Sequence, residues 1–542
     1  MKRSILLLAA IATALAAVPA ALAAKDKGAS APIEIQILNV SDWHGQLDPL
    51  DIQGVGRVGG AAVLSSYWKQ DREGNPNTLT LTAGDAFGAT PPLASFFDEE
   101  PAVKAMNLMG FTADTFGNHN FDKGTAHLQR MVDLAEFDFV SANLRNLDSN
   151  LSGVDPWRLY HVGGVKVAVI GITNPEAPTL VFPGSFGSIQ ILDPVAAANK
   201  FAAVARKAGA SVVVVLIHAG MTGKDADGRD IGPLRDFASK VENVDLVLGD
   251  HTDIQFAGRI GQTMAVENKS KGATYSKIQI KVDPRTKRVT SITNTFVTPF
   301  AAGVTPDPRI EEMLAPYRHE LSGKLDIKMG EASGFFVRGS NVERLREVAI
   351  GNLATDAMRL STGTQISIQN GGGIREPLPS SYKPADLTLR RATAGYAAGP
   401  PYDLVLGDGY AVFPFGNAVL TRLISGTQLL AALEHSVGSI PAANGKFLQI
   451  SGFRFVYDSS EPAGARVVSA TLDGGAAIMP GATYTVSMPD FVNFGGDGYT
   501  MFVDGQPFAT RNLLADAFNQ FVSESSPVTP TIEGRIVDLA RP

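Results

Sequence analysis

The sequence predicts an α/β protein with two domains. Its 542 residues exceed what one hydrophobic core usually serves, so the chain is expected to divide. Between residues 33 and 253, short runs of aliphatic and β-branched residues alternate with helix-like stretches, and this alternation is typical of α/β folds. The composition, 44% hydrophobic and 19% charged, excludes fibrous and wholly disordered classes of protein.

Residues 1–23 have the pattern of a secretory signal peptide. Lys2 and Arg3 precede an apolar run over residues 5–17, and the small residues of Ala21-Leu22-Ala23 mark a cleavage site. The alternative is a membrane anchor, which the shortness of the run disfavours. We therefore expect an exported protein, periplasmic or secreted, without a stable membrane anchor.

The charge balance bears on partners and ligands. Removal of the signal peptide changes the net charge from −7 to −9, and the chain has no dense run of Lys and Arg. This balance argues against binding to a nucleic acid polymer. The chain has no cysteine, so any metal site must use nitrogen and oxygen ligands.

Five strand-like segments end in potential metal ligands. Helix-like stretches over residues 60–70, 125–135 and 194–208 lie between them. The segments end, in chain order, at Asp42-Trp43-His44, Gly84-Asp85, Gly117-Asn118-His119, His218 and Asp250-His251-Thr252-Asp253. Because functional groups in α/β sheets gather beyond the carboxyl ends of the strands, we expect these side chains to converge.

The donor types indicate which cations fit. Imidazoles with carboxylates and one amide suit Zn²⁺, Mn²⁺, Co²⁺ or Fe²⁺ better than Ca²⁺ or Mg²⁺. A pair of metals needs about seven protein ligands with one carboxylate shared. Asp85 is the expected shared ligand, because it stands alone on a tight turn between the flanking motifs. Each motif alone is more often structural than functional, so the prediction depends on all five together.

In combination these motifs resemble the five blocks of the calcineurin-like metallophosphatases and, more narrowly, the 5'-nucleotidase family. The resemblance runs from about Ile33 to the C-terminus. It implies a four-layer αββα metallophosphatase sandwich over residues 33–302, a linker helix within 303–329 and an α/β substrate-binding domain over 330–542. The Pro-containing segment 303–309 and the charged amphipathic stretch 310–325 agree with that division.

The resemblance also implies roles for individual residues. One divalent metal ion is expected on Asp42, His44, Asp85 and Asp253, and a second on Asp85, Asn118, His218 and His251. His119 would stabilise the transferring phosphoryl group, and Asp122 would orient His119.

The chain departs from the family pattern at two positions. Asn120 stands where the family usually has Glu, and we expect activity to survive this change. Asp253 stands where the family usually has His, Gln or Asn. An anionic ligand there would shift metal preference towards Mn²⁺ or Fe²⁺.

Motifs in the C-terminal half resemble the substrate-binding domain of the same family. The matching segments are Gly351–Met358, Asn370–Arg375, Phe413–Asn417, Phe447–Gln449 and Phe491–Tyr499. By position, Arg375 would grip a phosphate or carboxylate, and Asp497 would accept a hydrogen bond from ribose or base. Phe447 and Phe491 would stack on the nucleobase.

An insertion over residues 376–402 separates Arg375 from the next motif. Its many Pro, Ser, Ala and Gly residues predict a long surface loop. Arg390 or Arg391 within it could supply a second phosphate-binding arginine, and the sequence leaves this open.

The sequence therefore predicts an exported phosphoesterase that acts on nucleoside 5'-monophosphates or related small-molecule nucleotides. Cyclic nucleotides, nucleotide sugars and sulfate-type groups are alternative substrates on the same fold. A non-catalytic exported nucleotide-binding protein is a further alternative, supported only by Asn120 and Asp253. The sequence does not fix the native metal, the preferred base or the oligomeric state.

Overall fold

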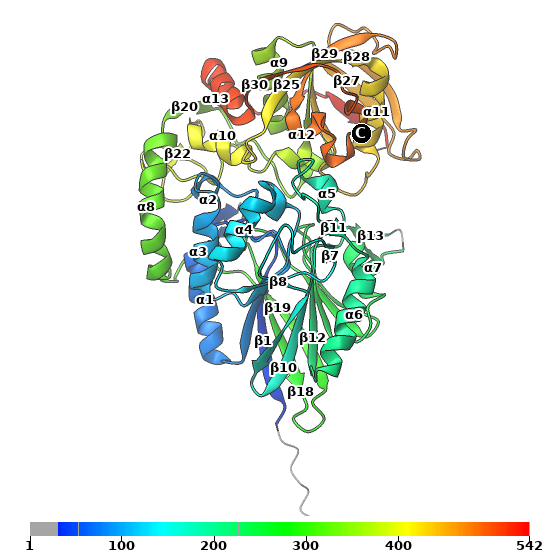
Figure 1. Ribbon diagram of the computed structural model, residues 1–542. Coiled ribbons are helices and arrows are strands. Elements are labelled where there is room, and N and C mark those ends of the chain that lie inside the picture. Colours follow the sequence, from blue (N-terminus) through cyan, green and yellow to red (C-terminus); the bar gives the residue numbers. More distant parts are fainter. Residues whose placement is uncertain (1–30, 53, 226, 541–542) are drawn as a thin grey trace, which may run out of the picture.

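The N-terminal part of the molecule contains two β-sheets that lie face to face (Figure 1). The computed structural model describes residues 31–540 except 53 and 226, so the predicted signal peptide lies outside the described residues. The first sheet has the order β19 (Val289–Val297), β18 (Tyr275–Val282), β1 (Ile33–Val40), β4 (Thr78–Thr82), β5 (Ala113–Asp114), β6 (Asp138–Val140) and β8 (Val154–Asp155). The second has the order β16 (Phe256–Ile260), β17 (Thr263–Glu267), β15 (Leu246–Leu248), β12 (Val212–Ile217), β10 (Val165–Ile172) and β9 (Trp157–Val162).

The central strands of both sheets are parallel and buried on both faces. Strand β12 has the sequence VVVVLI, which is apolar throughout because both faces of the strand are buried. Val212, Val214 and Leu216 pack in the core between the sheets. The alternate residues of the strand face the outer core with the helices. One strand thus contributes to two cores.

Helices cover the outer face of each sheet (Figure 1). The first sheet carries α1 (Ala61–Gly74), α3 (Glu100–Met109) and α4 (Gly124–Leu134), and the second carries α6 (Pro194–Lys207) and α7 (Pro233–Ala238). The order helix, sheet, sheet, helix confirms the predicted four-layer sandwich.

The C-terminal domain is also α/β. Its five-stranded sheet has the order β26 (Leu448–Ser451), β21 (Ile366–Asn370), β29 (Thr483–Pro489), β25 (Ala418–Ser425) and β30 (Phe508–Leu513). A smaller sheet contains β28 (Val467–Leu472), β27 (Phe453–Tyr457) and β31 (Ile536–Asp538). The accompanying helices are α9 (Ala349–Thr362), α11 (Gly426–Val437) and α13 (Leu514–Ser525).

Helix α8 (Pro308–Leu325) joins the two parts and lies along α1 and α3 (Figure 1). Its buried residues, Ile310, Leu314, Leu321 and Leu325, belong to the same core as the helices of the first sheet. Asp307 caps the helix by accepting from the Arg309 backbone N–H at 3.1 Å, and it also accepts from Ser65 Oγ at 2.7 Å. The linker helix is therefore fixed to the N-terminal domain at its first turn.

Replacing Asp307 with alanine is expected to lower the free energy of unfolding by about 1 kcal/mol, the usual cost of losing a helix N-cap. Hydrogen bonds from Arg309 lower the pKa of Asp307 from 3.8 to about 2. Since its folded pKa is depressed, the stabilisation is present above pH 3.8 and is lost as the pH falls through about 2. Urea unfolding, followed by the fluorescence of Trp68 on α1, measures the change. Asp307→Asn keeps a cap without the charge and should lose less; an unchanged midpoint for the alanine variant would contradict this role.

The insertion over residues 376–402 is held more firmly than the predicted surface loop. Arg391 and Asp408 form a fully buried ion pair, with Arg391 Nη1 at 2.6 Å from Asp408 Oδ2. Arg390 pairs with Asp403 and Glu331, at 2.7 Å in each case. Both arginines are thus occupied in anchoring the insertion, and neither is a second phosphate-binding arginine.

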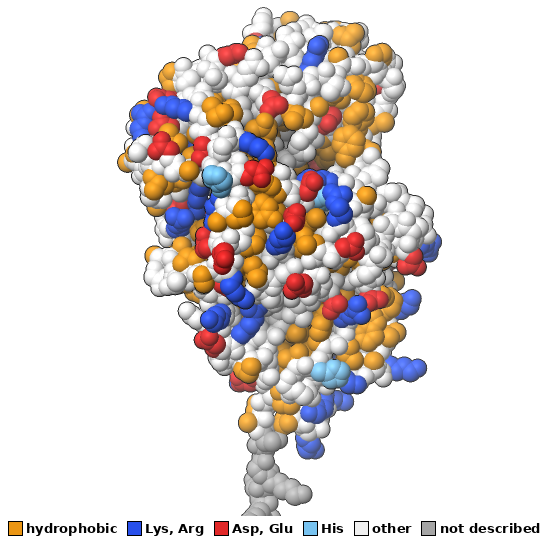
Figure 2. Space-filling model, turned by 60° about the vertical axis from the view of Figure 1, so that its left-hand side comes forward, with side chains coloured by type: hydrophobic (Ala, Val, Ile, Leu, Met, Phe, Trp, Pro, Cys, Tyr) orange, Lys and Arg blue, Asp and Glu red, His pale blue; other side chains and the backbone are white. Residues whose placement is uncertain are grey.

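The surface carries interspersed charges on the face that bears α8, which Figure 2 brings forward. Acidic, basic and hydrophobic side chains alternate there without a broad area of one sign. None of the helices that the structure describes combines the length and apolar composition that a membrane crossing needs.

Candidate active site

The ends of strands from both sheets meet at one edge of the sandwich. Asp42, Asp85 and Asn118 follow β1, β4 and β5 of the first sheet. His218 and His251 follow β12 and β15 of the second. The structure therefore brings together side chains that are separated by about two hundred residues of sequence, as the strand-end argument predicts.

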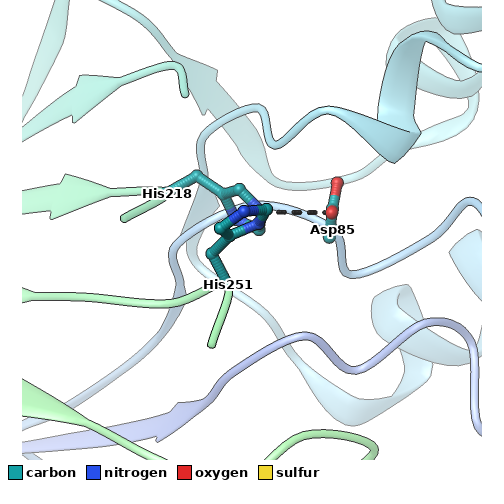
Figure 3. A group of neighbouring side chains, drawn as sticks. All are labelled: Asp85, His218 and His251. Atoms are coloured by element: carbon teal, nitrogen blue, oxygen red, sulfur yellow. Dashed lines mark hydrogen bonds and ion pairs between the residues drawn. The ribbon is translucent and has the colours of Figure 1, made fainter. Parts of the chain in front are cut away.

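The donor atoms of the carboxylates and imidazoles lie close enough to share a cation. His218 Nε2 is 3.1 Å from Asp85 Oδ2 (Figure 3). It is also 3.8 Å from Asp42 Oδ1. His44 Nε2 is also 3.8 Å from Asp42 Oδ1. Three groups of donors have all their atoms within 4.8 Å: Asp85 with His218 and His251, Asp42 with His44 and Asp85, and Asp42 with His218 and Asp250. Asp42, Asp85 and His218 each belong to two of these groups, and Asp85 is the residue common to the group with His44 and the group with His251.

The backbone at these residues is unusual. Five of the seven predicted ligands have positive φ: Asp42 (41°), His44 (49°), Asp85 (50°), His251 (89°) and Asp253 (60°). A non-glycine residue in this region is uncommon, and such residues gather at functional sites because the surrounding structure holds them there. The loops are therefore shaped to turn donor atoms inward at a cost in backbone energy.

Gly117 gives Asp85 its space. A Cβ at this position would lie 2.2 Å from Asp85 Oδ1 and 2.8 Å from His218 Cε1, too close for any side chain. The glycine before Asn118 is thus required by the close approach of the loops.

The histidines are oriented by hydrogen bonds to backbone carbonyls. His44 Nδ1 donates to the Gly88 carbonyl at 2.8 Å, and His218 Nδ1 donates to the Ala83 carbonyl at 3.0 Å. In each ring Nε2 then points into the site. Fixing the tautomer from outside in this way is typical of histidines that bind metals.

The electrostatics of the site suit a cation. Burial and the neighbouring His218 lower the pKa of His251 to about 3, and burial with Arg375 lowers the pKa of His44. Burial would lower the pKa of His218, but Asp85 raises it to about 9. Burial would raise the pKa of Asp85, but His218 lowers it below its ordinary value. Neutral imidazoles and an ionised carboxylate are the forms that bind metal, and a bound cation would replace the proton on His218.

Asp253 and its neighbour Asp250 differ from expectation. Asp253 lines the same small cavity as the ligands, but its carboxylate accepts from Ser270 N at 2.8 Å and Ser270 Oγ at 2.9 Å. It belongs to none of the donor groups found among the described residues. Asp250, which our sequence analysis did not select, is fully buried beside Asp42 instead. Its position just after β15 is the sequence feature that could have identified it as a candidate ligand.

His119 and Asp122 form the expected pair. His119 Nδ1 lies 2.9 Å from Asp122 Oδ2, so the opposite ring nitrogen is left to the cavity that His119 lines. The His119 backbone N–H donates to Asp85 Oδ1 at 2.8 Å, which couples this loop to the metal ligands.

Asn120 has a structural reason to differ from the family. Its Oδ1 accepts from the backbone N–H groups of Gly117 at 2.7 Å and Asp85 at 3.2 Å, and its Nδ2 donates to the Phe87 carbonyl at 3.1 Å. An amide can do both, whereas a carboxylate cannot donate. Asn120 thus ties together the loops that carry the ligands.

A cavity of about 380 Å³ adjoins the donor groups and opens between the domains. It is lined on the metal side by Asn118, His119 and His251 and on the C-terminal side by Arg344, Arg375, Phe415, Phe491 and Asp497, among others. Asp497 Oδ2 accepts from Asn370 Nδ2 at 2.7 Å. Of the four predicted substrate residues, Arg375, Phe491 and Asp497 are therefore placed in the cavity.

Phe447 is placed elsewhere. Its side chain is 1% exposed and packs in the core of the C-terminal domain, because it leads into the buried strand β26. The aromatic residue that lines the cavity with Phe491 is Phe415. It precedes an irregular turn at Gly416 (φ 69°), and its ring stacks on the His119 ring with the two centroids 5.4 Å apart. The prediction that Phe447 stacks on a base is thus wrong, and Phe415 is the aromatic residue at the cavity instead.

Cationic side chains close the site opposite the donor groups. Arg338, Arg344, Arg375 and Lys271 line a cavity of about 70 Å³ together with Asp42, His44 and Asp85. Arg375 Nη2 lies 3.3 Å from His44 Nε2. Arg344, which the sequence analysis missed, stands just before α9 in a segment without a distinctive pattern.

Comparison with known proteins agrees with this geometry. A family model described as "5'-nucleotidase, C-terminal domain" matches residues 328–504. A snake venom 5'-nucleotidase of Naja atra is 27% identical, with 93% of this chain and 98% of the relative covered. Endonuclease YhcR of Bacillus subtilis (strain 168) is also 27% identical over 93% of this chain, which spans 41% of the length of that relative.

A solved structure has the same fold over nearly the whole molecule. The crystal structure of a 5'-nucleotidase precursor from Thermus thermophilus is similar with a TM-score of 0.82 and 27% identity, and the match covers 94% of this chain and 100% of that one. The family model covers the C-terminal side of the cavity, including Arg375, Phe415, Phe491 and Asp497. The chain is therefore similar to 5'-nucleotidases over nearly its whole length, and these similarities indicate a metal-dependent phosphoester hydrolase.

Proposed function

We propose that the protein hydrolyses nucleoside 5'-monophosphates or closely related nucleotides to a nucleoside and phosphate. The observation that carries this proposal is that one cavity is lined both by candidate metal ligands, Asn118 and His251, and by two phenylalanines, Phe415 and Phe491. A phosphate ester whose phosphoryl group lay at the ligands could thus place a flat base between aromatic side chains.

Two divalent cations would be held by Asp42, His44, Asp85, Asn118, His218 and His251, with Asp85 shared. The buried N and O donors fit Mn²⁺, Zn²⁺, Co²⁺ or Fe²⁺. When bound, such a pair supplies Lewis-acid stabilisation of phosphoryl oxygens and lowers the pKa of water. Both hydrogen bonds from Ser270 go to Asp253 Oδ1, so Asp253 Oδ2 could hold a cation while Ser270 stays in place.

The side chains around the phosphoryl position have distinct tasks. Arg344 and Arg375 supply positive charge to bind the phosphate, since burial lowers the pKa of Arg375 only to about 10 and leaves it charged at neutral pH. Asp122 accepts from His119 Nδ1 and so directs the other ring nitrogen to the departing oxygen, to which a protonated His119 can give its proton.

The two aromatic assignments lead to a prediction that separates binding from stability. Phe491→Ala is expected to raise KM about tenfold with little change in kcat, because stacking on one base contributes about 1–3 kcal/mol. The back of this ring rests on Gly496, where a Cβ would come within 2.4 Å, and so its other face is left for a base. Phe447→Ala is instead expected to cost about 3–5 kcal/mol of stability, as truncation of a buried phenylalanine does.

Steady-state kinetics on AMP and urea unfolding of both variants measure these changes. Phe508→Ala, at an exposed position on β30, serves as the matched control. An increase of KM in a stably folded Phe447→Ala protein, with Phe491→Ala unaffected, would reverse the two assignments.

The experiment for the proposed activity is phosphate release from a panel of substrates. AMP, GMP, UMP, a cyclic nucleotide and a nucleotide sugar would be compared with added Mn²⁺, Zn²⁺ or Co²⁺ and with a chelator. We expect release from the monophosphates that the chelator abolishes. Preference for a cyclic nucleotide or a nucleotide sugar would select the alternative substrates, and absence of turnover with every metal would contradict the proposal.

We also propose that the protein is exported after cleavage behind residue 23, and that its domains divide at a linker within residues 303–329. The composition of residues 1–23 supports export, and α8 together with a family match that begins at residue 328 supports the division. N-terminal sequencing of protein recovered from the periplasm or medium tests the first, and limited proteolysis the second.

A further inference from the structure

A second large cavity lies beside the linker helix, on the face shown in Figure 2. Its volume is about 970 Å³, and it shares no lining residue with the two cavities of the catalytic site. Its walls are formed by residues 48–63 and Leu93 of the N-terminal domain, by residues 301–322 including most of α8, and by residues 382–396 of the insertion. We propose that this groove binds a small organic anion with an apolar body.

Within the range that the structure describes, the polar part of the groove has three cations, and only one of them is hydrogen-bonded to the acids that line it. Arg57, Arg318 and Lys383 surround one carboxylate, Asp48. Arg318 Nη2 binds Asp48 Oδ1 at 2.8 Å, and Arg318 Nη1 binds Glu311 at 2.8 Å. Asp48 and Glu311 accept their side-chain hydrogen bonds from Arg318, and Asp51 adds a further negative charge near Lys383.

Lys383 and Arg57 each have a buried side-chain nitrogen that makes no hydrogen bond to the described residues. Among the residues that the structure describes, Lys383 Nζ and Arg57 Nε have no hydrogen-bond partner. A buried charged donor without a partner is costly, and such exceptions require a reason. Burial lowers the pKa of Lys383, the carboxylates of Asp48 and Asp51 raise it, and Arg57 and Arg318 lower it. A carboxylate or phosphonate in the groove would supply the missing acceptors.

The rest of the lining determines the body of the ligand. Leu93, Val304, Leu321, Tyr382, Leu387 and Tyr396 provide apolar and aromatic surface around the charged end. A free inorganic ion would leave this surface unused, whereas an aromatic or aliphatic acid would cover it. The volume is large enough for a ligand of drug-like size.

The ligand would touch both domains. The insertion binds the end of α8 through Tyr382 Oη, which donates to Asp326 Oδ1 at 2.6 Å. It also reaches the N-terminal domain, where the Ala394 N–H donates to Asp51 Oδ1 at 3.4 Å. An anion seated between these contacts would add a further connection, so binding is expected to raise the unfolding temperature of the whole chain.

The test is isothermal titration of the full chain with benzoate and, separately, phenylphosphonate, neither of which is a hydrolysable ester. We expect both to bind at concentrations up to about 10 mM, and inorganic phosphate to bind less tightly at the groove. Lys383→Met should weaken binding of both probes at least tenfold while phosphate release from AMP is unchanged. Lys207→Met, at an exposed position on α6, is the matched control and should bind normally.

Two further variants separate the possible outcomes. Leu387→Asp, at a side chain 61% exposed on the rim, places a negative charge beside the anion and should weaken binding without affecting the fold. Arg375→Ala removes a cation from the catalytic cavity and should leave groove binding unchanged. Three results would each overturn the proposal. They are no binding of either probe, binding that neither Lys383→Met nor Leu387→Asp weakens, and binding that is lost only in Arg375→Ala. Because binding is measured directly, these results do not depend on the proposed activity.

Discussion

Replacing Asp85 with alanine is expected to lower kcat/KM by about 10³-fold or more. Loss of a residue that only hydrogen-bonds to a metal ligand typically costs roughly 10–100-fold, and loss of the ligand itself should cost more. The carboxylate is common to the donor group with His44 and the donor group with His251, so its removal would take a ligand from both proposed metal positions at once. It also accepts from the His119 backbone N–H, and so the catalytic histidine would lose its anchor. Metal content should fall together with turnover.

Metal analysis of the purified protein and phosphate release from AMP measure the two effects. Asp85→Asn keeps the shape and removes the charge, which separates loss of metal from collapse of the loop. Asp133→Ala, at an exposed position on α4, is the control for removing an aspartate from the same domain. Near-normal activity in Asp85→Ala protein that retains its metal would exclude Asp85 as the shared ligand.

Replacing His119 with alanine is expected to lower kcat by about 10²–10³-fold, within the range of general acid–base catalysis. His119 is held by Asp122 and faces the cavity, but it belongs to none of the donor groups among the described residues. Metal content should therefore stay normal, in contrast to the Asp85 variant.

Asp122→Asn should reproduce part of this loss, because it leaves the His119 tautomer unfixed. His161→Ala, on the exposed edge of β9, should behave as the wild type. Loss of metal in His119→Ala protein, or a change confined to KM, would show that His119 is a ligand or a binding residue instead.

The sequence predicted the metal site better than the substrate cavity, and the reason is geometric. Ligands such as Asp42, Asp85 and His218 come directly after apolar strands, and strand order fixes where strand ends meet. Asp250 and Asp253 both satisfy that rule. Asp253 lines the cavity with Ser270 bound to one of its oxygens, whereas Asp250 is buried beside Asp42, and no local pattern distinguishes the two positions.

The substrate residues depend on packing that no local pattern records. Phe447 and Phe415 both stand in segments that resemble the family, and only burial distinguishes them. Arg344 lies before α9 without a motif, and it reaches the site because the domains face each other there. The composition of the insertion predicts a polar, flexible loop. Part of it is nevertheless buried by the ion pair between Arg391 and Asp408, which are seventeen residues apart.

Anomalous diffraction from crystals grown with Mn²⁺ tests the metal assignment most directly. The expected result is two peaks about 3.5–4 Å apart, with the Asp85 carboxylate between them, as in two-metal phosphoesterases. Asp42 and His44 should contact one peak, and Asn118, His218 and His251 the other. No peak at these side chains, or a single peak that Asp85 does not contact, would contradict the binuclear site on which the proposed activity rests.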